Sequence, residues 1–161
     1  MKYVISGVAG FIGSNAAAYF LRKGWNVTIY DNLSRKGAKK NLLWLQSVGG
    51  KLVVLKGDLR KPADMSKLMP TVRNADAILH LAAQVAVTTS VLNPREDFEI
   101  NALGTFNLLE LMRLSKSHAK LIYSSTNKVY GGMEDVTVVE KKTRYEYKNL
   151  PYGASEERPL D

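Results

Sequence analysis

Short apolar segments alternate with longer amphipathic segments along most of this chain. Five runs rich in Val, Ile, Leu and Tyr have the composition of strands, at residues 2–6, 26–31, 51–58, 76–82 and 120–125. Helical patterns lie between them, at residues 15–24, 41–47, 63–69 and 97–116. Nearly continuous apolar strands that alternate with helices predict an α/β fold, a doubly wound parallel sheet with helices on both faces. From Gly131 onward the chain is polar, and we expect loop there with a short strand at 136–140.

Composition narrows the classes of function. The 161 residues are 45% hydrophobic and 24% charged, which is ordinary for one globular domain. There is no cysteine and there are two histidines, so disulfides and thiolate chemistry are excluded and no metal is expected. The N-terminus lacks the apolar core of a signal peptide, and no apolar run is long enough to cross a bilayer. We therefore expect a cytoplasmic protein without a membrane partner.

The net charge of +8 raises the question of a nucleic-acid partner. The basic residues fall into two separate groups, at 35–40 and 140–148, rather than one stripe interleaved with aromatic residues. We interpret them as solvated side chains, a few of which meet a phosphorylated small ligand. No nucleic acid is expected as a partner.

Three glycines, Gly7, Gly10 and Gly13, stand between the first strand and the first helix. Bare amides and the helix dipole favour an anion at such a turn, where glycine lets a pyrophosphate approach the backbone. The spacing GxxGxxG is one residue longer in its first gap than the dinucleotide fingerprint, and a tight turn favours glycine even without a ligand. The context supports a dinucleotide site more strongly than the glycines alone, because the second strand ends in Asp31, about 20 residues further on.

A carboxylate at the end of the second strand can accept hydrogen bonds from the ribose hydroxyls of an adenosine. Asp31 would repel a 2′-phosphate, so the sequence favours NAD over NADP. Arg35 and Lys36 follow closely and weaken that preference. The turn and Asp31 together predict a Rossmann-type dinucleotide site.

Two further polar residues come at or near the ends of strands. Asp58 ends the third strand, at the sheet edge where ligands of open α/β folds bind. Its position leaves two interpretations open, a ligand contact and a cap for the following turn. His80 lies within an apolar strand, and we interpret it as a buried core histidine rather than a catalytic base.

Six motifs in order resemble those of a known family: GVAGFIGS, YDNLSRKGA, GDLR, HLAAQVAV, NALGT and SSTNKVYG. They are similar to motifs of the extended short-chain dehydrogenase/reductases that epimerise or dehydrate nucleotide sugars. The resemblance covers essentially the whole chain. Within the family, residues 31–45, 80–90 and 125–131 look most like members that act on CDP-sugars.

The resemblance implies a fold, a cofactor and a reaction. The reaction oxidises a sugar carbon transiently, with NAD holding the hydride, and reduces it again from the opposite face; for a CDP-sugar the carbon would be C2. A nucleotide sugar, most often a CDP-sugar, is the implied partner. The implied cofactor residues are Gly7, Gly10, Phe11, Ile12 and Gly13 for the pyrophosphate, and Asp31, Asn32, Ser34 and Arg35 for the adenosine ribose. Those for the adenine are Asp58 and Leu59, and those on the nicotinamide side are Leu81, Ala82, Ala83, Gln84, Tyr123 and Ser124, with Asn101 as a structural asparagine.

The implied catalytic residue is Thr126, which matches the Ser/Thr that hydrogen-bonds the sugar hydroxyl being oxidised. Such a group is needed because hydride transfer requires close, oriented atoms. Asn127 and Lys128 match residues that hold the sugar. For Lys128, an exposed loop lysine without a ligand is an equally open interpretation.

The proton acceptor of the family is the tyrosine of a YxxxK motif. The near match is Tyr152, but Glu156 stands at the lysine position, and a carboxylate there raises the pKa of a tyrosine, the wrong direction for a base. Residues 143–161 instead resemble the loop and the SExxPLD segment that precede this motif in the family.

We therefore expect an N-terminal part of such an enzyme, inactive as it stands, without the Tyr–Lys pair, the last strands and the substrate domain. Residues 1–130 would form the NAD-binding domain and 131–161 a polar loop segment. The alternatives are a non-catalytic dinucleotide-binding or regulatory module, and a dehydratase of the same family. A sheet without its last strands exposes an edge through which copies of the chain could associate, so a homo-oligomer is possible.

Overall fold

The computed structural model describes residues 1–160, with the backbone alone for Asn127. The chain forms two compact units, Met1–Ser124 and Ser125–Asp161. The sequence interpretation divides the chain at residue 130 instead, and that functional division stays a prediction. The structural boundary falls earlier because Ser124 follows directly after the last strand of the first unit.

The first unit is built on a parallel five-stranded sheet in the order β3-β2-β1-β4-β5. Its strands are β1 (Lys2–Ser6), β2 (Asn26–Asp31), β3 (Leu52–Lys56), β4 (Ala77–His80) and β5 (Lys120–Tyr123). The chain proceeds outward from β1 to β3 and then returns to the other side of β1, where β4 pairs with it. The strand order thus reverses between β1 and β4, and ligands of open α/β sheets bind outside the strand ends at such a point. The predicted parallel sheet is confirmed.

Helices connect the strands. They are α1 (Phe11–Arg22), α2 (Ala38–Val48), α3 (Pro62–Arg73), α4 (Val87–Leu92), α5 (Pro94–Phe98) and α6 (Gly104–Leu114), with a π-helical turn η1 (Glu99–Leu103) between α5 and α6. The predicted helix at 97–116 is present, but the π turn interrupts it. Helix α1 begins at Phe11 rather than at the predicted residue 15. The sequence pattern missed its first turn because that turn contains Gly13, and glycine is a poor helix former.

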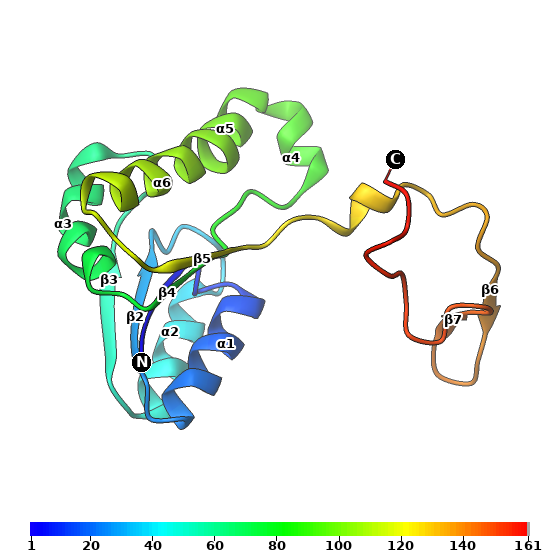
Figure 1. Cartoon of the computed structure of the whole chain (residues 1–161), viewed down its shortest axis with the longest axis horizontal. Helices are drawn as coiled ribbons and strands as arrows, with labels where there is room; N and C mark the ends of the chain where they lie inside the picture. The colour runs from blue at the N-terminus through cyan, green and yellow to red at the C-terminus, as the bar shows by residue number, and fades with distance from the viewer. Residues whose placement is uncertain (161) are drawn as a thin grey trace. The chain divides into compact units, whose positions relative to one another are not determined.

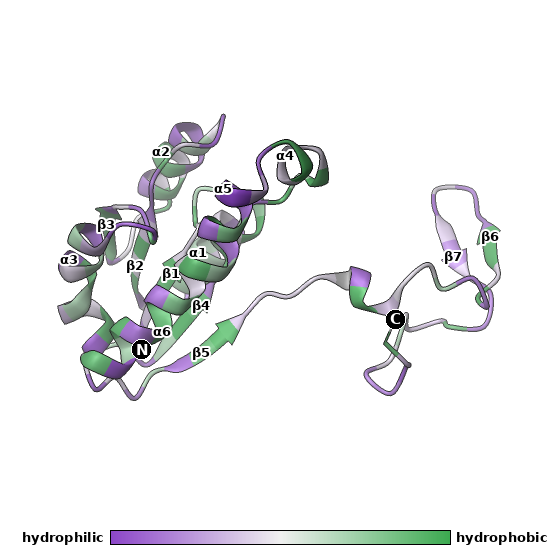
Figure 2. Cartoon of the chain, turned by 90° about the horizontal axis from the view of Figure 1, so that it is seen from above, coloured by the Kyte–Doolittle hydropathy of each residue, from purple (hydrophilic) through white to green (hydrophobic). Residues whose placement is uncertain are grey.

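Helices cover both faces of the sheet, as Figure 1 shows, with α1 and α2 on one face and α3 and α6 on the other. Two separate cores result. One joins Ile5 and Ile29 of the sheet to Ala17 of α1 and Leu45 of α2. The other joins sheet residues to α3 and α6, and includes Val4, Tyr30, Leu68, Ile78 and Leu108. Figure 2 shows β1 and β4 in the hydrophobic colours between these helices, in agreement with the predicted pattern of strands buried on both faces.

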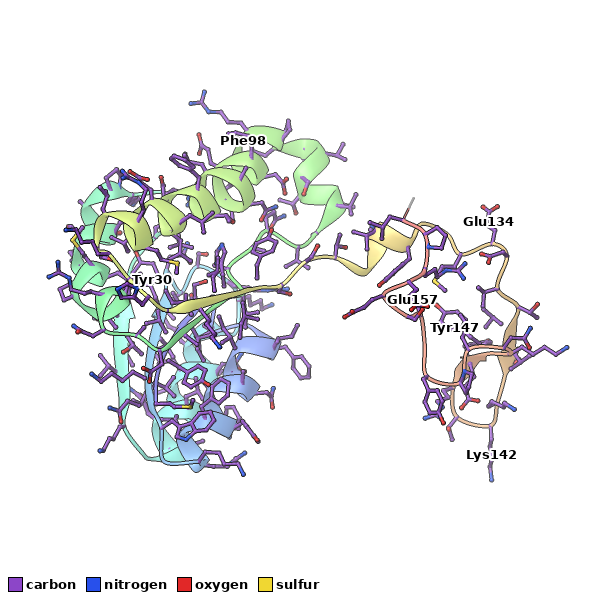
Figure 3. All side chains as sticks on the ribbon, in the orientation of Figure 1. Tyr30, Phe98, Glu134, Lys142, Tyr147 and Glu157 are labelled. Atoms are coloured by element: carbon purple, nitrogen blue, oxygen red, sulfur yellow. The ribbon has the colours of Figure 1, made fainter. Side chains whose placement is uncertain are left out.

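The second unit has little regular structure. It contains a 3₁₀ turn, η2 (Asn127–Tyr130), and an antiparallel hairpin of β6 (Val138–Glu140) and β7 (Tyr145–Tyr147). The predicted strand at 136–140 corresponds to β6, whereas β7 is only three residues long and was not predicted. Figure 3 labels Tyr147 of the hairpin, together with Glu134, Lys142 and Glu157 of the same unit.

Candidate functional site

The glycine turn after β1 is closely packed on two sides and open on the third. Gly7 has φ +71°, and a Cβ there would lie 2.5 Å from the amide nitrogen of Ala82. A Cβ on Gly13 would lie 2.6 Å from Cα of Val8. A Cβ on Gly10 would meet nothing nearer than the Gly7 carbonyl oxygen at 3.4 Å. The fold itself therefore requires Gly7 and Gly13, whereas Gly10 leaves its backbone accessible to a ligand.

The first turn of α1 presents amide groups to this open side. The first bond into the helix runs from the Ser14 N–H to the Gly10 carbonyl oxygen, at 3.1 Å, so the amides of Phe11 and Ile12 precede it. The first turn contains no acidic residue, and the side chains of Phe11 and Ile12 are exposed. Amides and helix dipole together favour a bound anion.

Asp31 ends β2 beside the glycine turn and orders the backbone around it. One carboxylate oxygen accepts a 2.9 Å hydrogen bond from the Ala9 N–H, and the other accepts one of 2.7 Å from the Leu33 N–H. Asn41 of α2 donates to the Ala9 carbonyl oxygen at 2.7 Å, so Ala9 is held from both sides. Each Asp31 oxygen keeps lone pairs for further donors, such as the hydroxyls of a ribose.

The loop after β2 meets the end of β3 through side chains. Asn32 accepts hydrogen bonds from the amide and the hydroxyl of Ser34 and donates to Asp58 at 3.3 Å. Arg60 pairs with the Asp58 carboxylate, at 2.7 Å for the shortest contact, and its hydrogen bonds lower the pKa of Asp58 to about 2. The Arg60 N–H also donates to Asp58, so this residue does cap its turn. Arg35 is exposed.

The segment Leu81–Gln84 follows β4 and packs against the glycine turn. The Leu81 N–H donates to the Ser6 carbonyl oxygen at 3.1 Å, and Ala82 lies against Gly7. Further along, the Gln84 N–H donates to Oδ1 of Asn101 at 2.8 Å. Asn101 therefore ties the segment to the π turn.

A small cavity of about 50 Å³ opens beside this segment. Its walls come from the ends of β4 and β5 and from the π turn: His80, Leu81, Ala82, Ala83, Asn101, Tyr123 and Ser124. His80 is buried and hydrogen-bonded at both ring nitrogens, which confirms it as a core histidine. Tyr123 and Ser124 are exposed. The structure thus brings the predicted nicotinamide-side residues of the first unit to one place.

The remaining predicted residues lie elsewhere. The Leu59 side chain is buried in the core on the α3 side, and its carbonyl oxygen accepts a hydrogen bond from the Asn107 side chain. Thr126 is exposed in the second unit, where its hydroxyl accepts from the Lys128 N–H at 3.2 Å and caps η2. Lys128 and Tyr152 are exposed. The side chain of Asn127 lies outside the described residues.

Several residues of this site were not predicted from the sequence. Arg60, Asn41 and Thr105 each reach it through a side chain from another element. The sequence signal for Arg60 was present in the GDLR motif, where a cation follows the carboxylate by two residues. The contacts of Asn41 and Thr105 join positions far apart in the chain and have no local pattern.

Comparison with known proteins identifies the family. Residues 4–156 match the family described as GDP-mannose 4,6 dehydratase. This chain belongs to that family. A curated relative, CDP-paratose 2-epimerase of Salmonella typhi, is 48% identical over all 161 residues of this chain, which span 47% of its length. The resemblance to nucleotide-sugar epimerases drawn from the six motifs is confirmed.

Two solved structures are similar to this chain in fold. A UDP-glucose 4-epimerase of Stenotrophomonas maltophila, solved with NAD and formylated UDP-arabinopyranose, has a TM-score of 0.74 at 30% identity, over 83% of this chain and 39% of its own. A Thermus thermophilus UDP-glucose 4-epimerase in complex with NAD has a TM-score of 0.72 at 31% identity, over 100% of this chain and 44% of its own. The chain spans about half the length of the curated relative described above. Within residues 1–160, no helix combines the length and apolar character needed to cross a membrane.

Proposed function

We propose that these residues form the NAD-binding part of a nucleotide-sugar epimerase that transiently oxidises C2 of a CDP-sugar. The family and the fold support an enzyme acting on nucleotide sugars. The 48% identity to CDP-paratose 2-epimerase along the whole chain supports a CDP-sugar and C2, the specificity of CDP-tyvelose (CDP-paratose) epimerase.

The observation that carries this proposal is the open side of the glycine turn beside Asp31. Gly10 has room for an approaching phosphate, and the helix amides next to it face no acidic residue of their own turn. The Asp31 carboxylate, already fixed by two backbone amides, can accept from ribose hydroxyls. These residues fit a dinucleotide, which supplies the hydride acceptor when bound.

Each part of the site has a distinct task in this proposal. Gly10, Phe11 and Ile12 bind the pyrophosphate through backbone amides. Asn32, Ser34 and Arg35 form the loop over the adenosine ribose, and Asp58 and Leu59 border the adenine. Leu81–Gln84, held by Asn101, form the nicotinamide side together with Tyr123 and Ser124.

The sugar side of the proposal rests on Thr126, which aligns the hydroxyl to be oxidised, with Asn127 and Lys128 holding the sugar. We infer that residues 1–161 do not turn over by themselves. Tyr152 is followed by Glu156 at the lysine position of the YxxxK motif, so this tyrosine lacks the family's partner. Tyr19 does have a lysine four residues further on, Lys23, but it lies on α1 and not in the segment after β5.

Calorimetric titration with NAD⁺ and NADP⁺ tests the cofactor assignment. We expect NAD⁺ to bind at least about tenfold more tightly, because Asp31 repels the 2′-phosphate; this corresponds to about 1.4 kcal/mol. Asp31→Asn should narrow this difference. Equal affinities, or no heat with either nucleotide, would contradict the assignment.

The substrate assignment needs the protein isolated from its native source. A CDP-sugar deuterated at C2 and incubated in ordinary water should give an epimer that keeps its deuterium, because the hydride is returned within the site. Loss of deuterium to water would contradict transient oxidation at C2. Turnover of UDP-glucose in place of the CDP-sugar would contradict the substrate class, and NAD binding without any turnover would favour a non-catalytic module.

A further inference from the structure

A buried chain of hydrogen bonds passes through His80 and joins four parts of the first unit. The Nδ1 atom of His80 lies 2.6 Å from the Ser6 hydroxyl at the end of β1. The Nε2 atom lies 2.9 Å from the Thr105 hydroxyl on α6. The Ser6 hydroxyl also accepts from the Ala82 N–H at 3.4 Å. Ser6 and His80 are each 1% exposed, so water does not compete for the bond between them, whereas the bonds to Thr105 and from Ala82 are partly buried.

The geometry at Thr105 decides which ring nitrogen carries the proton. The Thr105 hydroxyl donates its single proton to the Asn101 carbonyl oxygen at 2.6 Å. It can therefore only accept from His80, which places the ring proton on Nε2. The bare Nδ1 then accepts from the Ser6 hydroxyl, and the lone pairs of Ser6 face the Ala82 N–H. Every group in the chain donates and accepts consistently with a neutral imidazole.

Asn101 continues the chain to a second point of the same segment. Its Nδ2 donates to Asp97 at 3.0 Å, which fixes the orientation of the amide and turns Oδ1 toward the Gln84 N–H. Asp97 in turn accepts from the Ser90 hydroxyl at 2.6 Å. Asn101 lies in the π turn, an irregularity that often marks functional sites in helices. Both ends of the segment Ala82–Gln84 are thus attached to one polar network.

We propose that His80 is a positioning residue, whose neutral Nε2-protonated ring holds Ala82–Gln84 against Gly7 and so shapes the nicotinamide half of the crevice. This inference rests on the proposed function for the identity of the ligand. The segment has no bulky side chain with which to anchor itself, since it consists of two alanines and a half-buried glutamine. Its position depends on the groups that bind its backbone amides.

The network reaches the nicotinamide side and not the adenosine side. The adenosine half is ordered by Asp31, Asn41 and the Arg60–Asp58 pair, none of which is hydrogen-bonded to His80, Ser6 or Thr105 in the described residues. Substitutions that break the network should therefore weaken the binding of NAD⁺ and leave the binding of ADP unchanged, because ADP ends before the second ribose. A general loss of stability would weaken both nucleotides together.

Substitutions on either side of His80 remove its two hydrogen bonds one at a time. Thr105→Val removes the acceptor for Nε2, and Thr105→Ser keeps it and should restore wild-type behaviour. Ser6→Ala removes the link to Ala82. Ser115→Ala is the matched control, because Ser115 is equally buried but its hydroxyl bonds only to Met112 on its own helix.

Calorimetry with NAD⁺ and ADP gives the first readout on the 161-residue chain. We expect Thr105→Val and Ser6→Ala to bind NAD⁺ about tenfold more weakly, because each variant loses one or two hydrogen bonds. The affinity for ADP should change by less than about twofold. Thr105→Ser and Ser115→Ala should match the wild type. Equal losses for NAD⁺ and ADP, or no loss for either, would overturn the proposal.

Nuclear magnetic resonance gives a second readout that needs no nucleotide. In the wild type the His80 ring should carry its proton on Nε2, and the amide of Ala82 should exchange slowly with solvent. Ser6→Ala should accelerate exchange at Ala82 and leave the amide of Leu108 in the core protected. A proton on Nδ1, or unchanged exchange at Ala82, would overturn the proposal; failure of the wild type to bind NAD⁺ would refute only the proposed function.

Discussion

His80 is a neutral histidine whose environment opposes protonation. Burial lowers the pKa of its ring to about 4, from an ordinary value of 6.5. The network around it agrees with this direction, since a proton on Nδ1 would displace the proton that Ser6 donates there. The ring thus acts as a fixed link in the hydrogen-bond network at neutral pH rather than as a proton donor.

This pKa predicts how stability depends on pH. Between pH 6.5 and about 4 the unfolded chain binds a proton at His80 and the folded chain does not, so the free energy of unfolding falls as the pH falls. The full contribution is roughly 3 kcal/mol, from about 1.4 kcal/mol per pKa unit. Urea unfolding across this range measures it.

Two variants provide the comparison for the pH experiment. His80→Asn, whose side chain does not titrate, should make the free energy of unfolding depend less steeply on pH between 6.5 and about 4. His118→Gln removes an exposed histidine and should leave the dependence as in the wild type. An equally steep fall in His80→Asn would show that other groups cause it.

Some residues of the site have a sequence signature and others do not. Gly7, Gly10, Gly13 and Asp31 could be predicted because a strand, a tight turn and a helix follow one another within about 30 residues. Asn41 could not, because its bond to Ala9 depends on how α2 packs beside the turn. The burial of the Leu59 side chain likewise follows from the packing of α3 and α6, which no local pattern encodes.

At the scale of elements, the packing of α1 against the turn that follows β1 depends on Gly13. We expect Gly13→Ala to reduce the free energy of unfolding by roughly 1–3 kcal/mol, because its Cβ would overlap the Val8 backbone. Gly10→Ala should cost about 1 kcal/mol or less, since alanine only replaces glycine as the helix N-cap. Chemical denaturation of both variants measures the difference, and equal losses would contradict the packing described for α1.

All five predicted strands are present, but β3, β4 and β5 end at Lys56, His80 and Tyr123, before the predicted ends at 58, 82 and 125. Strands β1 and β2 have the predicted bounds, and the sheet is parallel as expected. Helix α4 and strand β7 are too short to show periodicity, and the sequence gives no sign of them. The π turn η1 depends on one extra residue in a helical turn, which a pattern of apolar positions does not resolve.

At the scale of the whole molecule, both hydrophobic cores belong to the first unit. Their buried members run from Val4 to Leu111, and the residues packed on them extend to Leu121. We therefore expect residues 1–124 to fold alone and to unfold cooperatively near the midpoint of the full chain. Circular dichroism during heating tests this; a shortened chain without a cooperative transition would show that residues 125–161 are needed for folding.

The central claim is that the open side of the glycine turn binds the pyrophosphate of NAD. The most direct measurement is the affinity of Gly10→Ala for NAD⁺ by titration calorimetry, beside the wild type and the control Gly132→Ala in the second unit. A Cβ at Gly10 meets no close protein atom, so the variant should fold and yet bind NAD⁺ at least about tenfold more weakly, while Gly132→Ala binds normally. A folded Gly10→Ala that binds NAD⁺ as tightly as the wild type would contradict the claim.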